Sequence, residues 1–134
     1  LDRDIQMGTL KTRVKDEKEI DNKNYVKIVT DGEGFALYFS RSPLPCYRDV
    51  RSNRVYFRHL GFYVYRKPFL STFASLPLGE LENAEKLEQL RALEYGFRIK
   101  VAETPLDSIE VDTPQDIKKV EEMMALSKVG KTSL

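Results

Sequence analysis

Asp112 combines a residue type and a position that could support metal-dependent chemistry. It stands in the run VDTPQD at 111–116, where Thr113 is a favoured N-cap residue and Pro114 suits the first position of a helix. A carboxylate just before a helix lies where open α/β sheets collect ligands. It could bind Mg²⁺, which takes oxygen ligands and leaves further positions to substrate phosphates. Alternatively, Asp112 only stabilises the positive end of the helix dipole.

Two further side chains could contact a substrate. His59 lies in the aromatic segment 55–66, where a period of two places it on the same face as Tyr63. It is either a hydrogen-bonded core group or a catalytic base. Arg41 precedes a stiff Pro-x-Pro step, so its guanidinium could be presented to an anion. The alternative for Arg41 is an ordinary surface ion pair.

Glu88 and Gln89 are neighbours in a predicted helix over 80–95. They point about 100° apart, so we expect one to face outward and the other to lean toward the sheet. Their ordinary explanation is solvent exposure and helix propensity.

Alternating and β-branched residues predict the strands that must position these groups. The predicted strands cover 7–14, 25–30, 35–39, 55–66 and 97–103. The run DGEG at 31–34 joins two of them in a β-hairpin, and Gly61 indicates a bulge or a close approach in the aromatic strand.

Apolar residues at helical spacing predict three helices. They cover 67–76, 80–95 and a last helix that begins at Thr113. The second has a stripe of apolar residues at three-residue spacing, at Leu81, Ala84, Leu87, Leu90 and Leu93, with Gly96 as its C-cap. In the last helix we expect Ile117, Val120 and Met124 to be buried, and we predict a flexible tail at 127–134.

The composition excludes several classes of protein. The 134 residues carry a formal net charge of +1, which argues against a nucleic-acid arm or a polybasic membrane anchor. No apolar run reaches the roughly 18 residues of a membrane span, and we expect one domain in the cytoplasm. The single cysteine, Cys46, agrees with a reducing compartment. Because the chain starts with Leu1, we expect it to be a fragment.

Four motifs together resemble a known family. They are ALYFSRSPLP at 36–45, RHLGFYVYR at 58–66, LEQLRALEYG at 87–96 and VDTPQDI at 111–117. Over about residues 7–126 the sequence resembles the carboxyl-terminal half of the 3-deoxy-manno-octulosonate (KDO) cytidylyltransferases, or CMP-KDO synthetases. The resemblance implies an α/β fold with a mixed sheet and flanking helices. This would be the carboxyl-terminal part of a nucleotide-diphospho-sugar transferase-like fold. Residues 1–126 would form part of that domain, with 25–66 as its sugar-binding and dimerisation region.

The resemblance also implies an activity and a set of site residues. The family transfers a cytidylyl group from CTP to KDO, releasing pyrophosphate and giving CMP-KDO for lipopolysaccharide synthesis, with Mg²⁺ as cofactor and a homodimer as the assembly. Asp112 matches the family's second Mg²⁺-binding carboxylate, which makes it the expected catalytic and metal residue. The positions that contact the sugar acid match Arg41, His59, Tyr63, Glu88 and Gln89.

The sequence lacks the family's amino-terminal half, which holds the triphosphate loop and the cytosine pocket. We therefore expect the full-length protein to be the enzyme and this chain by itself to be inactive. Two alternatives stay open: a non-catalytic dimerisation or sugar-acid-binding module, and a cytidylyltransferase for another sugar acid such as sialic acid. The motifs RHLGFYVYR and LEQLR argue against sialic acid.

Overall fold

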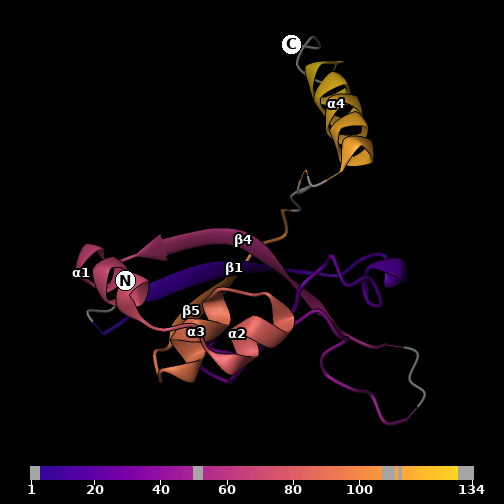
Figure 1. Cartoon of the computed structure of the whole chain (residues 1–134). Coiled ribbons are helices and arrows are strands. Elements are labelled where there is room, and N and C mark those ends of the chain that lie inside the picture. The colour runs from indigo at the N-terminus through magenta and orange to yellow at the C-terminus, as the bar shows by residue number, and fades with distance from the viewer. Residues whose placement is uncertain (1–3, 50–52, 107–110, 112, 130–134) are drawn as a thin grey trace.

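The structure is a computed structural model that describes residues 4–49, 53–106, 111 and 113–129. A five-stranded sheet forms its centre, in the strand order β3-β2-β4-β1-β5. Figure 1 shows β1, β4 and β5 of this sheet. The strands are β1 (Met7–Arg13), β2 (Lys27–Thr30), β3 (Ala36–Ser40), β4 (Phe57–Tyr65) and β5 (Ile99–Glu103). Strands β1 and β5 are parallel, whereas the other neighbouring strands are antiparallel. The sheet is therefore mixed and has flanking helices, as predicted.

The hairpin of β2 and β3 closes through Asp31. Its Oδ1 atom accepts hydrogen bonds from the backbone N–H groups of Glu33 and Phe35, each at 2.9 Å. An Asp side chain that satisfies the following backbone amides is a common way to stabilise a tight turn. The predicted hairpin is confirmed.

Strand β4 carries the predicted irregularity at Gly61. Leu10 of β1 lies opposite Leu60, but the preceding residue, Thr9, lies opposite Tyr63. Gly61 and Phe62 therefore have no counterpart on β1, and they form a bulge. The bulge keeps His59 and Tyr63 on one face, because it adds two residues to a period of two.

The helices are α1 (Lys67–Ser75), α2 (Glu80–Glu85), α3 (Gln89–Glu94) and α4 (Pro114–Val129), with a short 3₁₀ helix at Glu17–Glu19. The prediction of one continuous helix over 80–95 is wrong. Lys86, at the end of α2, adopts a left-handed conformation with φ 54°, so the chain turns before α3 begins. The apolar spacing does not reveal this turn, because Leu87 before the start of α3 and Leu90 after it are both buried and continue the three-residue pattern.

Gly96 ends α3 as predicted. It has φ 82°, its N–H group bonds to the carbonyl of Leu93 at 3.0 Å, and the N–H group of Phe97 bonds to that of Ala92 at 2.9 Å. This pair of bonds is a Schellman motif, which needs a residue that tolerates the left-handed region.

The core lies between the sheet and helices α1 and α3. Its fully buried side chains include Phe39 of β3, Leu90 of α3 and Ile99 of β5. Figure 1 shows α2 and α3 lying against the sheet and α4 standing apart from it. Because these side chains are buried on one face of the sheet, the other face of β1, β4 and β5 points outward.

Helix α4 begins as predicted, but its expected buried stripe is wrong. Thr113 and Asp116 cap it reciprocally, with the Thr113 N–H group donating to Asp116 Oδ2 at 2.9 Å and the Asp116 N–H group donating to Thr113 Oγ1 at 3.3 Å. Ile117 and Met124 are 48% and 57% exposed, and Val120 is half-buried. Within the described residues no element packs extensively against this helix. The helix also continues to Val129, into the segment predicted as a flexible tail.

Candidate functional site

His59 occupies a buried position on the helix-covered face of β4. Its side chain is only slightly accessible, its ring lies edge-on to Phe39 at a centroid distance of 5.0 Å, and its Nε2 atom lies 2.8 Å from Thr9 Oγ1. Burial lowers the pKa of His59 to about 4. The ring is neutral at pH 7, so it suits a hydrogen bond with a hydroxyl better than an ion pair with a carboxylate.

Tyr63 continues this surface beyond the bulge. Its ring lies 5.3 Å from that of His59 and stacks on Tyr65 at 5.9 Å. Burial raises the pKa of Tyr65, and the nearby negative charge of Glu88 raises it further. Glu88 is therefore close to the same row of rings, although its side chain is exposed.

Gln89 opens α3 and turns inward, with 5% of its surface exposed. The pair thus follows the prediction, with Glu88 outward and Gln89 toward the sheet. Gln89 has no side-chain hydrogen bond among the described residues, and none of their fully buried side-chain nitrogen or oxygen atoms lacks a partner. Its amide atoms therefore reach the surface, where a ligand can meet them.

Arg41 lies just past the end of β3 and is held by carbonyl groups. Its Nε donates to the carbonyl of Glu85 at 2.7 Å, one terminal nitrogen donates to that of Lys23 at 2.9 Å, and the other donates to that of Lys86 at 3.4 Å. These bonds use three of the five guanidinium N–H donors. The remaining two have no partner in the described part of the chain, so a fixed guanidinium can still bind an anion.

Glu85 is a residue that the sequence analysis missed. Its two carboxylate oxygens accept from Ser40 Oγ at 2.7 Å and from the Arg41 N–H group at 2.8 Å. These bonds tie the end of β3 to the end of α2. Nothing in the sequence marks Glu85 for this role, because its partners lie more than 40 residues away.

Asp112, the expected metal ligand, lies outside the described residues. Its neighbour Thr113 is placed, and the helix that follows starts as the motif predicts. In the part of the chain that the structure describes, no three His, Cys, Asp or Glu side chains are grouped so as to hold a metal ion.

The comparisons with known proteins decide the family. Residues 2–124 match the family model described as cytidylyltransferase. The chain belongs to this family. It is 51% identical over 124 residues to the 3-deoxy-manno-octulosonate cytidylyltransferase of Solibacter usitatus, covering 92% of this chain and 49% of that protein. The corresponding enzyme of Koribacter versatilis is 55% identical over 123 residues, with 92% and 47% covered.

Two further proteins are similar to this chain. The 8-amino-3,8-dideoxy-manno-octulosonate cytidylyltransferase of Shewanella baltica is 51% identical over 123 residues, covering 92% of the chain and 50% of that protein. The solved structure of a CMP:2-keto-3-deoxy-manno-octonic acid synthetase complexed with CTP is 36% identical, with a TM-score of 0.86. That match covers 94% of the chain and 52% of the solved one. The expected fold is confirmed, and the chain spans about half the length of these relatives.

Proposed function

We propose that the protein containing this chain transfers a cytidylyl group from CTP to KDO, giving CMP-KDO and pyrophosphate. The observation that carries the proposal is the identity of 51–55% to KDO cytidylyltransferases over nearly the whole chain. The polar groups near β4 and α3 support it.

These groups suit a sugar acid. The two remaining N–H donors of Arg41 fit a carboxylate, and the neutral ring of His59 and the amide of Gln89 fit hydroxyl groups. Glu88 and the hydroxyl of Tyr63 would complete the contacts with the ring substituents. The contribution of this half is to bind and orient the sugar acid, so that its anomeric hydroxyl faces the α-phosphate of CTP.

Mg²⁺ is the cofactor that we propose, with Asp112 as the ligand and catalytic carboxylate from this chain. A single carboxylate with substrate phosphates fits the way in which Mg²⁺ is commonly bound. When bound, the ion neutralises the charge that develops on the phosphate oxygens.

A closely related substrate is the second candidate. Relatives from Shewanella are named for 8-amino-3,8-dideoxy-manno-octulosonate, and the Shewanella baltica protein shares 51% identity with this chain. Overall identity therefore does not separate the two sugar acids, and the assay must offer both.

We also propose that the protein acts as a homodimer through the outward face of β4. Phe62 and Val64 are 60% and 55% exposed there, beside an apolar hollow of about 230 Å³ between β1, β4 and β5. Sedimentation at several concentrations tests this proposal. Dimers that Phe62→Glu weakens would support it, whereas monomers throughout would contradict it.

The remaining predictions on partners and location belong to the same proposal. Among the described residues no helix has the length and hydrophobicity needed to cross a membrane. Cys46 is a free, exposed thiol, which supports the predicted cytoplasmic location. We propose no nucleic-acid partner.

The test is a chimera in which this chain replaces the matching 124-residue segment of the Solibacter usitatus relative. Incubation with CTP, Mg²⁺ and KDO should release pyrophosphate and give CMP-KDO by mass spectrometry, with the relative itself as positive control. The 8-amino sugar acid is supplied in a parallel reaction. If only the 8-amino compound gives product, that compound and not KDO is the substrate. No product from either would contradict the proposed activity.

The chain by itself provides a second arm of this assay. We expect no pyrophosphate from it, because the family's triphosphate loop is not among its motifs. Turnover by the isolated chain would show that our account of the nucleotide site is wrong.

A further inference from the structure

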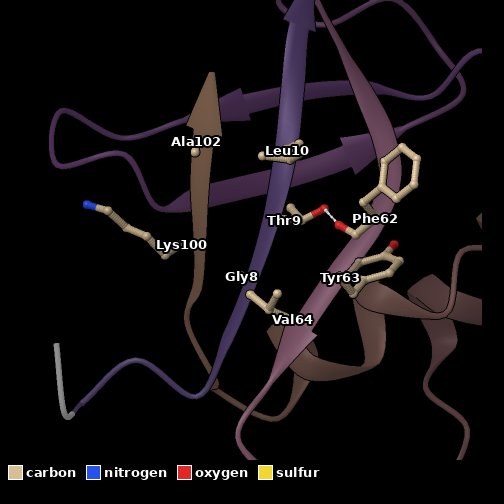
Figure 2. Close-up of a pocket in the computed structure, with 8 residues that line it drawn as sticks. All are labelled: Gly8, Thr9, Leu10, Phe62, Tyr63, Val64, Lys100 and Ala102. Atoms are coloured by element: carbon tan, nitrogen blue, oxygen red, sulfur yellow. Dashed lines mark hydrogen bonds between the residues drawn. The ribbon is translucent and has the colours of Figure 1, made fainter. Parts of the chain in front are cut away.

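The bulge in β4 creates a demand for hydrogen bonds that Thr9 meets. Because Gly61 and Phe62 lie out of register with β1, carbonyl groups at the bulge need partners other than the ladder. Thr9 Oγ1 lies 2.7 Å from the carbonyl oxygen of Phe62 (Figure 2). It also lies 3.3 Å from the carbonyl oxygen of Leu60. The threonine hydroxyl is buried directly beside the bulge.

The same hydroxyl contacts His59, and this contact assigns the ring proton. A hydroxyl has one hydrogen to donate, and a carbonyl can only accept. If Thr9 donated to His59, the Thr9 hydroxyl oxygen and the Phe62 carbonyl oxygen would lie 2.7 Å apart with no hydrogen between them. If Thr9 donates to Phe62, Nε2 of His59 must carry the proton that fills the 2.8 Å contact. The second arrangement satisfies both contacts.

The other ring nitrogen of His59 is then left as an acceptor. Within the described residues the ring makes no side-chain hydrogen bond besides that to Thr9, and no fully buried polar side-chain atom lacks a partner. Nδ1 therefore reaches the surface. With the proton on Nε2, Nδ1 offers a lone pair and accepts a hydrogen bond.

We propose that Thr9 is a positioning residue that holds His59 in the Nε2-protonated form, so that Nδ1 accepts a hydrogen bond from a hydroxyl of the sugar acid. The proposal rests on the proposed function for its ligand, but its statement about the ring concerns this chain alone. Thr9 acts through His59 and does not itself contact the substrate.

Nitrogen NMR of the ring tests the first half of the proposal. His59 is the only histidine of the sequence, so ¹⁵N-labelled chain gives one pair of ring signals. We expect the Nε2-protonated form in the unaltered chain and in Thr9→Ser, and a mixture of both tautomers in Thr9→Val. A ring protonated at Nδ1 in the unaltered chain would overturn the proposal.

Kinetics in the chimera test the second half. We expect Thr9→Val to raise the KM for the sugar acid about fivefold, which corresponds to the loss of one hydrogen bond, and to leave the KM for CTP unchanged. Thr9→Ser, which keeps the hydroxyl, should restore the KM. In a His59→Gln background, Thr9→Val should have no further effect on the KM.

The outcomes separate this proposal from the proposed function. An additive effect of Thr9→Val in the His59→Gln background would mean that Thr9 has only a structural role. A chimera that is inactive with either sugar acid would contradict the proposed function, while the NMR result would still decide the state of the ring.

Discussion

Arg41 and Glu85 bond to each other reciprocally. The carboxylate of Glu85 accepts from the backbone N–H group of Arg41 at 2.8 Å, and the side-chain Nε of Arg41 donates to the backbone carbonyl of Glu85 at 2.7 Å. Each side chain thus satisfies a backbone group of the other residue. The end of β3 and the turn before α3 are fixed together, which holds the guanidinium in one place.

Glu85→Gln should weaken this connection. The amide keeps one oxygen acceptor, so either Ser40 Oγ or the Arg41 N–H group loses its partner, at a cost of about 1–2 kcal/mol of stability. We expect a severalfold higher KM for the sugar acid in the chimera and an unchanged KM for CTP. The matched control is Glu121→Gln, on the exposed surface of α4. Equal effects of both substitutions would contradict a specific role for Glu85.

Protonation of His59 should make the stability of the chain depend on pH. The folded pKa of about 4 lies below the ordinary value of 6.5, so the unfolded state binds the proton more readily. Stability contributed by the neutral ring is present above pH 6.5 and is lost as the pH falls toward 4. We expect a loss of roughly 2 kcal/mol between pH 7 and pH 5, measured by urea unfolding. His59→Gln should abolish this dependence of stability on pH. A dependence that survives in His59→Gln would show that other groups cause it.

Lys86 should be replaceable by glycine without loss of stability. Its φ of 54° strains any residue with a Cβ atom, although glycine also increases the entropy of the unfolded chain. We expect Lys86→Gly to be neutral or stabilising by less than about 1 kcal/mol, and Lys86→Val to destabilise by more than about 1 kcal/mol. Thermal unfolding of the two variants checks this order, and the reverse order would contradict it.

Glu82 and Arg91 fix the angle between α2 and α3. Two short bonds join them, at 2.6 and 2.7 Å, and both side chains are largely buried. Arg91→Met should cost about 3 kcal/mol, because it leaves the Glu82 carboxylate buried without its partner.

Two further variants check that explanation. Combining Glu82→Leu with Arg91→Met should recover part of the loss, because both charges are then removed. Arg54 and Glu17 form an exposed ion pair, with 3.9 Å between the charged atoms. Arg54→Met, which removes this pair, should lower the free energy of unfolding by less than about 1 kcal/mol. A double variant that is less stable than Arg91→Met would contradict the explanation.

Local patterns predicted the strands, the Gly61 bulge, the end of α3 at Gly96 and the start of α4 at Thr113, because each of these features depends on neighbouring residues. The turn at Lys86 was missed because it is stabilised by tertiary contacts, among them the bonds that Glu85 makes to β3. The stripe on α4 was misassigned for a related reason, since a period shows which side chains share a face but not whether anything covers it.

The candidate site likewise contains residues that the sequence indicated and residues that it did not. The resemblance selected Arg41, His59, Tyr63, Glu88 and Gln89, and the structure shows the hydrogen bonds that hold Arg41 and His59. Residues that act through others, such as Thr9 and Glu85, carry no local signal because their contacts cross 44 to 53 positions of sequence. The role of Asp112 stays a prediction that rests on its motif.

The most direct test of the proposed sugar-acid site is the pair of KM values of the chimera carrying His59→Gln. We predict at least a fivefold rise in the KM for KDO and a change of less than about twofold in the KM for CTP, because in the proposed site the ring bonds to the sugar acid and not to the nucleotide. An unchanged KM for KDO, or an equal rise for both substrates, would contradict it.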